Sequence, residues 1–156
     1  MKLVPLALAL IVTALPLASQ AQQSGVAADE QVVLKQVLND KRAVFANNLG
    51  LEDSESRAFW PVYDEYEGKA KKLDDRFLAL LDNYANKYDS LTDADAGSLL
   101  KEKMAIEKDH AALKQEYTKK VAKVLPAKKA LRYAQIETRV ETLLRSQLYS
   151  IIPLAN

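Results

Sequence analysis

Apolar residues recur every three or four positions along most of this chain of 156 residues, the spacing of amphipathic α-helices. The clearest run is Phe59, Tyr63, Tyr66, Ala70, Leu73, Phe77, Leu80 and Tyr84. Its steps alternate between four and three residues, the heptad pattern of helices that pack side by side. Acidic residues at 52–55 suit the start of this helix, which we expect to end near Tyr88. Pro61 either kinks it or begins a new helix.

A shorter helix is predicted before this run. It begins at Asp29 and ends at Gly50, because glycine adopts the left-handed conformation that closes a helix. Its apolar positions are the pairs 33/34, 37/38 and 44/45, followed by 49. The polar residues between these pairs predict that only one face is buried.

Two more helices are predicted after a polar break at 89–92. Thr92 and Asp95 have the spacing of a capping box, so a helix begins there and runs to Leu125. Pro126 cannot continue that helix but starts the next one well. The inward residues expected in the last helix are Leu131, Tyr133, Ile136, Val140, Leu143, Leu144 and Leu148.

The pattern predicts an all-α fold, an elongated antiparallel helical hairpin of long amphipathic helices with shorter flanking N- and C-terminal helices. The break at 89–92 is short, and this forces the two long helices to lie antiparallel. Only 4 glycines leave few turns, which favours long helices. The apolar tail Ile151–Leu154 either covers the end of the bundle or is offered to a partner.

The first residues have the pattern of a signal peptide. A positive start at Lys2 is followed by a short apolar run and by small residues at Ser19 and Ala21. We predict a signal peptide over 1–21 cleaved after Ala21, a flexible mature N-terminus over 22–28 and one all-helical domain over 29–156. The alternative is an uncleaved N-terminal anchor. No later stretch is apolar enough for a membrane span, so the mature protein is expected in the periplasm.

Charge and cysteine content exclude some classes of protein. The sequence has 22 Lys+Arg and 21 Asp+Glu, and the loss of Lys2 leaves 21 of each sign. A nucleic-acid-binding protein needs a basic excess, so this class is excluded. Cys is 0, so neither a disulfide nor a lipid on cysteine is available, and the hydrophobic core must stabilise the fold.

The residues predict a protein that is not an enzyme and binds no cofactor or metal. There is no cysteine nucleophile and no glycine-rich phosphate loop. The single histidine, His110, lies on the apolar stripe between Ile106 and Leu113 and is interpreted as a packed side chain. His110 and Met104 together make a poor transition-metal site.

Basic residues gather where the third predicted helix meets the fourth. They either pair with the acidic residues at 53–67, or form a basic rim that attracts acidic or unfolded client proteins by long-range electrostatics. Two aromatic residues near this end, Trp60 and Tyr63, either pack in the core or line a client groove. The client-binding candidates are therefore Lys119, Lys120, Lys123, Lys128, Lys129, Arg132, Trp60 and Tyr63.

The layout resembles the Spy/CpxP family of small periplasmic helical proteins, which carry a Leu-Thr-x-x-Gln motif before two of their helices. The corresponding segments here are Leu51-Glu52-Asp53-Ser54-Glu55 and Leu125-Pro126-Ala127-Lys128-Lys129. Neither has the full motif, and Leu91-Thr92 has its first half at the middle turn. The resemblance implies an elongated helical homodimer shaped as a cradle, whose members bind unfolded envelope proteins without ATP.

We therefore expect a periplasmic ATP-independent chaperone or envelope stress-response binding protein that holds unfolded clients on a helical surface. The alternative is a structural or adaptor protein of the cell envelope that docks one fixed partner, with the tail Ile151–Leu154 as the contact.

Overall fold

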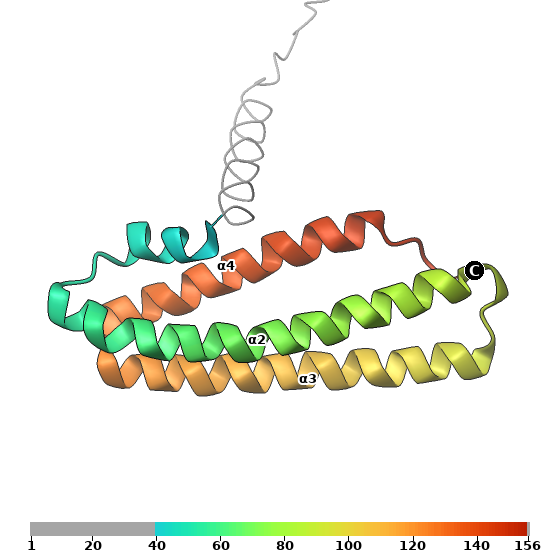
Figure 1. Ribbon diagram of the computed structural model, residues 1–156, viewed down its shortest axis with the longest axis horizontal. Coiled ribbons are helices and arrows are strands. Elements are labelled where there is room, and N and C mark those ends of the chain that lie inside the picture. Colours follow the sequence, from blue (N-terminus) through green and yellow to red (C-terminus); the bar gives the residue numbers. More distant parts are fainter. Residues whose placement is uncertain (1–39, 156) are drawn as a thin grey trace, which may run out of the picture.

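The computed structural model of the chain describes residues 40–155, which form an all-α structure without strands (Figure 1). A helix over 40–49 precedes α2 (Asp53–Lys87), the short 3-10 turn η1 (Tyr88–Ser90), α3 (Asp93–Val124) and α4 (Ala127–Ile151). The all-α prediction is confirmed. No helix within these residues is long and apolar enough to cross a membrane. The predicted signal peptide, its cleavage after Ala21, the segment 22–28 and the helix start at Asp29 lie outside the described residues.

Local sequence signals set the helix ends. Gly50 has a φ of 59°, the left-handed conformation that closes the helix over 40–49. At the start of α2, the backbone N–H of Glu52 donates to the carboxylate of Glu55 over 2.8 Å. At the start of α3, the hydroxyl of Thr92 accepts from the backbone N–H of Asp95 over 3.1 Å, as the capping box predicts.

Pro61 does not begin a new helix, because α2 continues through it from Asp53 to Lys87. A proline inside a helix removes one backbone hydrogen bond. Here the rings of Phe59 and Tyr63 on either side are buried, at 0% and 2% exposure. Burial of this face compensates for the missing bond.

The long helices α2 and α3 run antiparallel. The rings of Tyr66 and Tyr117 are 5.5 Å apart near one end of the pair. At the other end Lys87 Nζ lies 2.5 Å from Asp95 Oδ1. The last helix, α4, runs back along this pair and places its end beside α2, where the ring of Tyr149 lies 6.2 Å from the ring of Phe77 (Figure 1).

The main core lies at the end of the bundle that holds the Gly50 and Pro126 turns, here called the proximal end. Phe45, Tyr63 and Tyr133 form an aromatic cluster, with ring centroids 4.9 Å and 5.6 Å from Phe45. Four helical segments contribute to this cluster, which contains Phe45, Leu49, Phe59, Tyr63, Val121, Leu125, Ala130 and Tyr133. The distal end, at η1, has no comparable cluster among the described residues.

Burial corrects the predicted apolar stripes in two places. On α2 the stripe is buried at Phe59, Tyr63, Tyr66, Ala70 and Phe77, but half-buried at Leu73, Leu80 and Tyr84. On α4 the prediction that Leu131 points inward is wrong, because its side chain is 61% exposed. The core face of α4 instead contains Ala130, Tyr133, Glu137 and Val140, and the position of Leu131 lies to one side of this line.

The apolar tail folds back onto the distal end. The hydroxyl of Tyr84 donates to the carbonyl of Pro153 over 2.9 Å, and that of Tyr88 donates to the carbonyl of Leu154 over 3.1 Å. The side chains of Ile151 and Leu154 remain 77% and 88% exposed. The tail is therefore held through its backbone, with the side chains of Ile151 and Leu154 largely exposed and that of Ile152 half-buried.

Candidate functional site

Two members of the predicted basic rim, Lys129 and Arg132, close the proximal end. Lys129 Nζ lies 2.5 Å from Glu55 Oε2 and donates to the carbonyl of Gly50 over 2.7 Å. Arg132 donates to the carbonyl of Asn48 over 3.4 Å. Both side chains therefore satisfy carbonyls at the end of the helix over 40–49, as cations near a helix C-terminus do.

The other rim residues divide between paired and exposed side chains. Lys120 Nζ lies 3.0 Å from Glu116 and 3.4 Å from Glu65, and the hydrogen bond that Lys120 donates to Glu116 raises the pKa of Lys120. This matches the interpretation of the rim as ion pairs with the start of α2. Within residues 40–155, three exposed rim lysines have no ion-pair partner: Lys119, Lys123 and Lys128.

The two aromatic candidates occupy different positions. Tyr63 is 2% exposed, and burial raises the pKa of its hydroxyl. Trp60 is half-buried, donates from Nε1 to Ser56 Oγ over 2.8 Å and lies under the guanidinium of Arg42 at 4.0 Å. In this conformation Tyr63 serves the core, and only Trp60 presents part of its ring at the surface.

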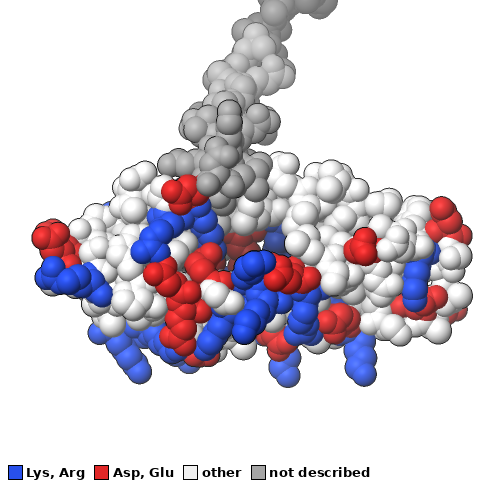
Figure 2. Space-filling model, in the orientation of Figure 1, with Lys and Arg blue, Asp and Glu red and all other residues white. Residues whose placement is uncertain are grey.

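A largely apolar groove of about 480 Å³ lies at the distal end, between α2, α3 and the tail. Sequence reasoning did not single it out, because it depends on how α4 and the tail return to the hairpin. Leu100 at its edge is 57% exposed. Figure 2 shows few charged side chains over the distal part of α4, whereas charges of both signs gather over the middle of this face. Residues that line the groove include Leu80, Leu81, Leu99, Leu100, Tyr149 and Leu154.

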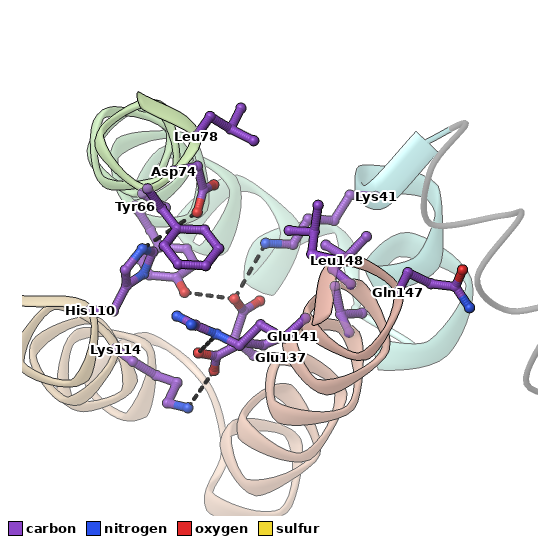
Figure 3. Close-up of a pocket in the computed structure, with 15 residues that line it drawn as sticks. Lys41, Tyr66, Asp74, Leu78, His110, Lys114, Glu137, Glu141, Gln147 and Leu148 are labelled. Atoms are coloured by element: carbon purple, nitrogen blue, oxygen red, sulfur yellow. Dashed lines mark hydrogen bonds and ion pairs between the residues drawn. The ribbon is translucent and has the colours of Figure 1, made fainter. Parts of the chain in front are cut away.

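A second, more polar cavity of about 300 Å³ lies midway along the bundle (Figure 3). The helix over 40–49, α2, α3 and α4 all contribute to its walls. Glu137, on α4, is 3% exposed and is the only charged residue that is buried within residues 40–155. Its Oε1 accepts from Tyr66 Oη over 2.6 Å and from Lys41 Nζ over 3.3 Å. Its Oε2 has no hydrogen-bond partner.

Lys41, on the helix over 40–49, lies between two carboxylates beside this cavity. Its Nζ lies 2.8 Å from Glu67 Oε1 and 3.3 Å from Glu137 Oε1. Burial by itself would lower the pKa of Lys41, but the charges of Glu137 and Glu67 outweigh it and raise this pKa. Burial also raises the pKa of the Glu67 carboxyl, against the opposing effect of Lys41.

The wall toward α3 carries His110. Its Nε2 lies 3.4 Å from Asp74 Oδ1, and burial lowers the pKa of the imidazole. Nearby, Glu141 accepts from Lys114 over 2.6 Å and from Arg145 over 3.0 Å. His110 is thus half-buried against α2, in line with the interpretation of a packed side chain. No group of three or more ligating side chains within the described residues is arranged to hold a metal ion.

Sequence reasoning missed Glu137 as a functional candidate. The available signal was its position, because Tyr133, Glu137 and Val140 are spaced by four and three residues and share one helix face. A carboxylate on an otherwise apolar stripe indicates a buried polar group with a specific partner.

Comparison of the chain with models of protein families, with curated proteins and with solved structures found no match. The resemblance to the Spy/CpxP family therefore stays a prediction, and the functional argument rests on the described surfaces.

Proposed function

We propose that this protein is an exported, ATP-independent chaperone or stress-response binding protein that holds unfolded envelope proteins in the distal groove. The proposal rests on the distal groove, an open and largely apolar hollow with a volume of about 480 Å³. Exposed apolar surface bordered by polar residues is a feature of protein interaction sites. The N-terminal sequence, which has the pattern of a signal peptide, supports export.

Clients would bind through apolar contacts that do not depend on their sequence. Unfolded chains expose apolar side chains, and each Å² of apolar surface removed from water contributes about 25 cal/mol. The groove offers aliphatic side chains such as Leu99 and Leu100. The exposed rim lysines at the proximal end attract acidic segments over longer distances, which raises the encounter rate more than the affinity.

The test is suppression of aggregation by the purified mature protein, with several unrelated unfolded substrates. Leu100→Asn places a polar amide in the groove at a side chain that is already 57% exposed, so the fold should persist. Leu131→Asn is the matched control, since Leu131 is 61% exposed on α4, does not line the groove, and the neutral amide leaves the charge of the neighbouring basic rim unchanged. We expect Leu100→Asn to weaken suppression and Leu131→Asn to leave it unchanged. Equal activity of both variants would exclude the groove.

The basic rim is tested separately with Lys120→Glu combined with Lys123→Glu. If the rim steers clients, this variant keeps its helical far-UV spectrum but captures clients more slowly at low salt, where screening is weakest. If the lysines only pair with α2 carboxylates such as Glu65, the melting temperature falls and capture per folded molecule is unchanged. Melting and capture are measured on the same sample.

The adaptor function remains the second candidate, favoured by the exposed side chains of Ile151 and Leu154. An adaptor would show no general suppression of aggregation by the wild-type protein. It would instead yield one crosslinked envelope partner, and removal of residues 151–156 would abolish that crosslink.

A further inference from the structure

We propose that the polar cavity midway along the bundle binds a small primary amine with an apolar body, and that Glu137 receives the ammonium group. The cavity lies between the helix over 40–49, α2, α3 and α4 (Figure 3). Of its lining residues only Phe77 also lines the distal groove. This inference does not depend on the proposed chaperone function.

The cavity has the size and lining for a compact amphipathic molecule. An engineered apolar cavity of about 150 Å³ holds a benzene molecule, so about 300 Å³ accommodates a phenyl ring with a short amine chain. One part of the wall is apolar and consists of Ala70, Phe77, Val140, Leu144 and Leu148. The polar part is concentrated around Glu137, which fixes the orientation of a bound amine.

Glu137 supplies an acceptor that the protein itself does not use. Its Oε1 is occupied by Tyr66 and Lys41, at 2.6 Å and 3.3 Å. Its Oε2 is buried and has no partner. Leaving a buried acceptor unsatisfied costs about 1–3 kcal/mol, and more for a charged group. A ligand that donates to Oε2 recovers this free energy, whereas an acceptor or a hydrocarbon does not.

The local charge favours a cationic donor over a neutral one. Beside the cavity, two carboxylates, Glu67 and Glu137, share the single ammonium of Lys41. The charged side chains that line the cavity are balanced, with three carboxylates (Asp74, Glu137 and Glu141) and three cations (Lys41, Lys114 and Arg145). Glu67, which pairs with Lys41 from outside this lining, adds a fourth carboxylate. His110 adds no charge, because burial lowers its pKa. One further cation balances the network.

The experiment titrates the mature protein with 2-phenylethylamine at pH 7 and follows backbone amide chemical shifts. The amine is protonated at this pH, by analogy with lysine, whose pKa is about 10.4. We expect saturable shifts confined to residues around the cavity, such as Ala70, Val140 and Leu144. The neutral isostere 2-phenylethanol should bind at least about tenfold more weakly, because it lacks the charge.

Glu137→Gln keeps the shape of the side chain and removes its charge. It should weaken amine binding at least about tenfold and abolish the preference for the amine over the alcohol. Glu116→Gln is the matched control, since Glu116 pairs with Lys120 on the surface of α3 and does not line the cavity. This control should bind the amine like the wild type. Far-UV circular dichroism and thermal melting verify that each variant is folded.

A second variant, Leu144→Phe, fills part of the cavity without touching the carboxylate. It should prevent binding of both the amine and the alcohol, which separates loss of space from loss of charge. Absence of cavity-confined shifts at millimolar amine would overturn the proposal. So would equal binding of amine and alcohol by the wild-type protein, a measurement that needs no variant.

Discussion

The apolar side chains follow the same heptad spacing at the proximal and distal ends of the bundle, but they are buried to different extents at the two ends. At the proximal end Leu49 and Phe59 are fully buried, at 0% exposure. At the distal end Leu80 and Leu99 are half-buried and Leu100 is 57% exposed. Both ends contain the same long helices, α2 and α3, so the periodicity of the sequence does not explain the difference.

The difference arises from the number of helical segments that meet at each end. The helix over 40–49 packs on α2 and α4 at the proximal end, where Phe45 meets the rings of Tyr63 and Tyr133. At the distal end only α2, α3, the end of α4 and the tail meet, and an apolar groove remains between them. Heptad spacing therefore predicts which face of a helix points inward, whereas packing of the helix over 40–49 determines whether that face is fully covered.

The largest difference between the two ends is expected when one leucine at each end is replaced by alanine. Leu49→Ala removes a fully buried side chain and leaves a cavity, so we expect a loss of about 2–5 kcal/mol in the free energy of unfolding. Leu99→Ala lies in an open groove where no closed cavity forms, and it should cost less than about 1.5 kcal/mol. Urea denaturation measures both values. Similar losses at the two sites would mean that the distal end is closed in solution.

A glycine pair tests the turn at Gly50, which connects the helix over 40–49 to α2 at the proximal end. Gly50→Ala should destabilise the protein by about 1–2 kcal/mol, because alanine disfavours the left-handed backbone at φ 59°. An added Cβ meets nothing within 4 Å at Gly50, so this cost is purely conformational. Gly68→Ala, inside α2 and equally open, should stabilise by up to about 1 kcal/mol. Opposite signs in thermal melts are expected, and equal signs would contradict the assigned turn.

The smallest expected effect concerns His110, which lies between the two ends. Burial lowers its pKa in the folded state, with Asp74 opposing this and Arg145, Glu141 and Lys114 nearby. The unfolded chain therefore binds a proton first as the pH falls below about 6.5, so His110 lowers stability toward acidic pH and has no such effect above that value.

His110→Gln isolates this contribution. We expect the stability of the wild type to fall more than that of the variant between pH 7 and pH 5, as measured by urea denaturation. The comparison cancels the titration of other carboxylates such as Glu67, whose raised pKa acts with the opposite sign. A parallel pH dependence of the two proteins would show that His110 is not buried against Asp74.

Local sequence signals alone predict α2, α3 and α4 with their ends, and the end of the helix over 40–49. Gly50, the Thr92–Asp95 capping box and Pro126 act on backbone groups within a few residues of themselves, so their effects are readable without knowledge of the rest of the chain. The apolar period likewise identified Tyr63 and Tyr133 as inward-facing, because a helix places positions three and four apart on one face.

How completely each helix face is covered, and which polar groups meet, depends on the tertiary structure. Glu137 accepts from Tyr66 and Lys41, which are 71 and 96 residues away along the chain, and no local pattern encodes such pairs. The exposure of Leu131 and the groove beside Leu100 have the same origin, since both depend on the path of α4 over the hairpin. Burial is a property of neighbours from distant segments, whereas helix formation depends on hydrogen bonds four residues apart.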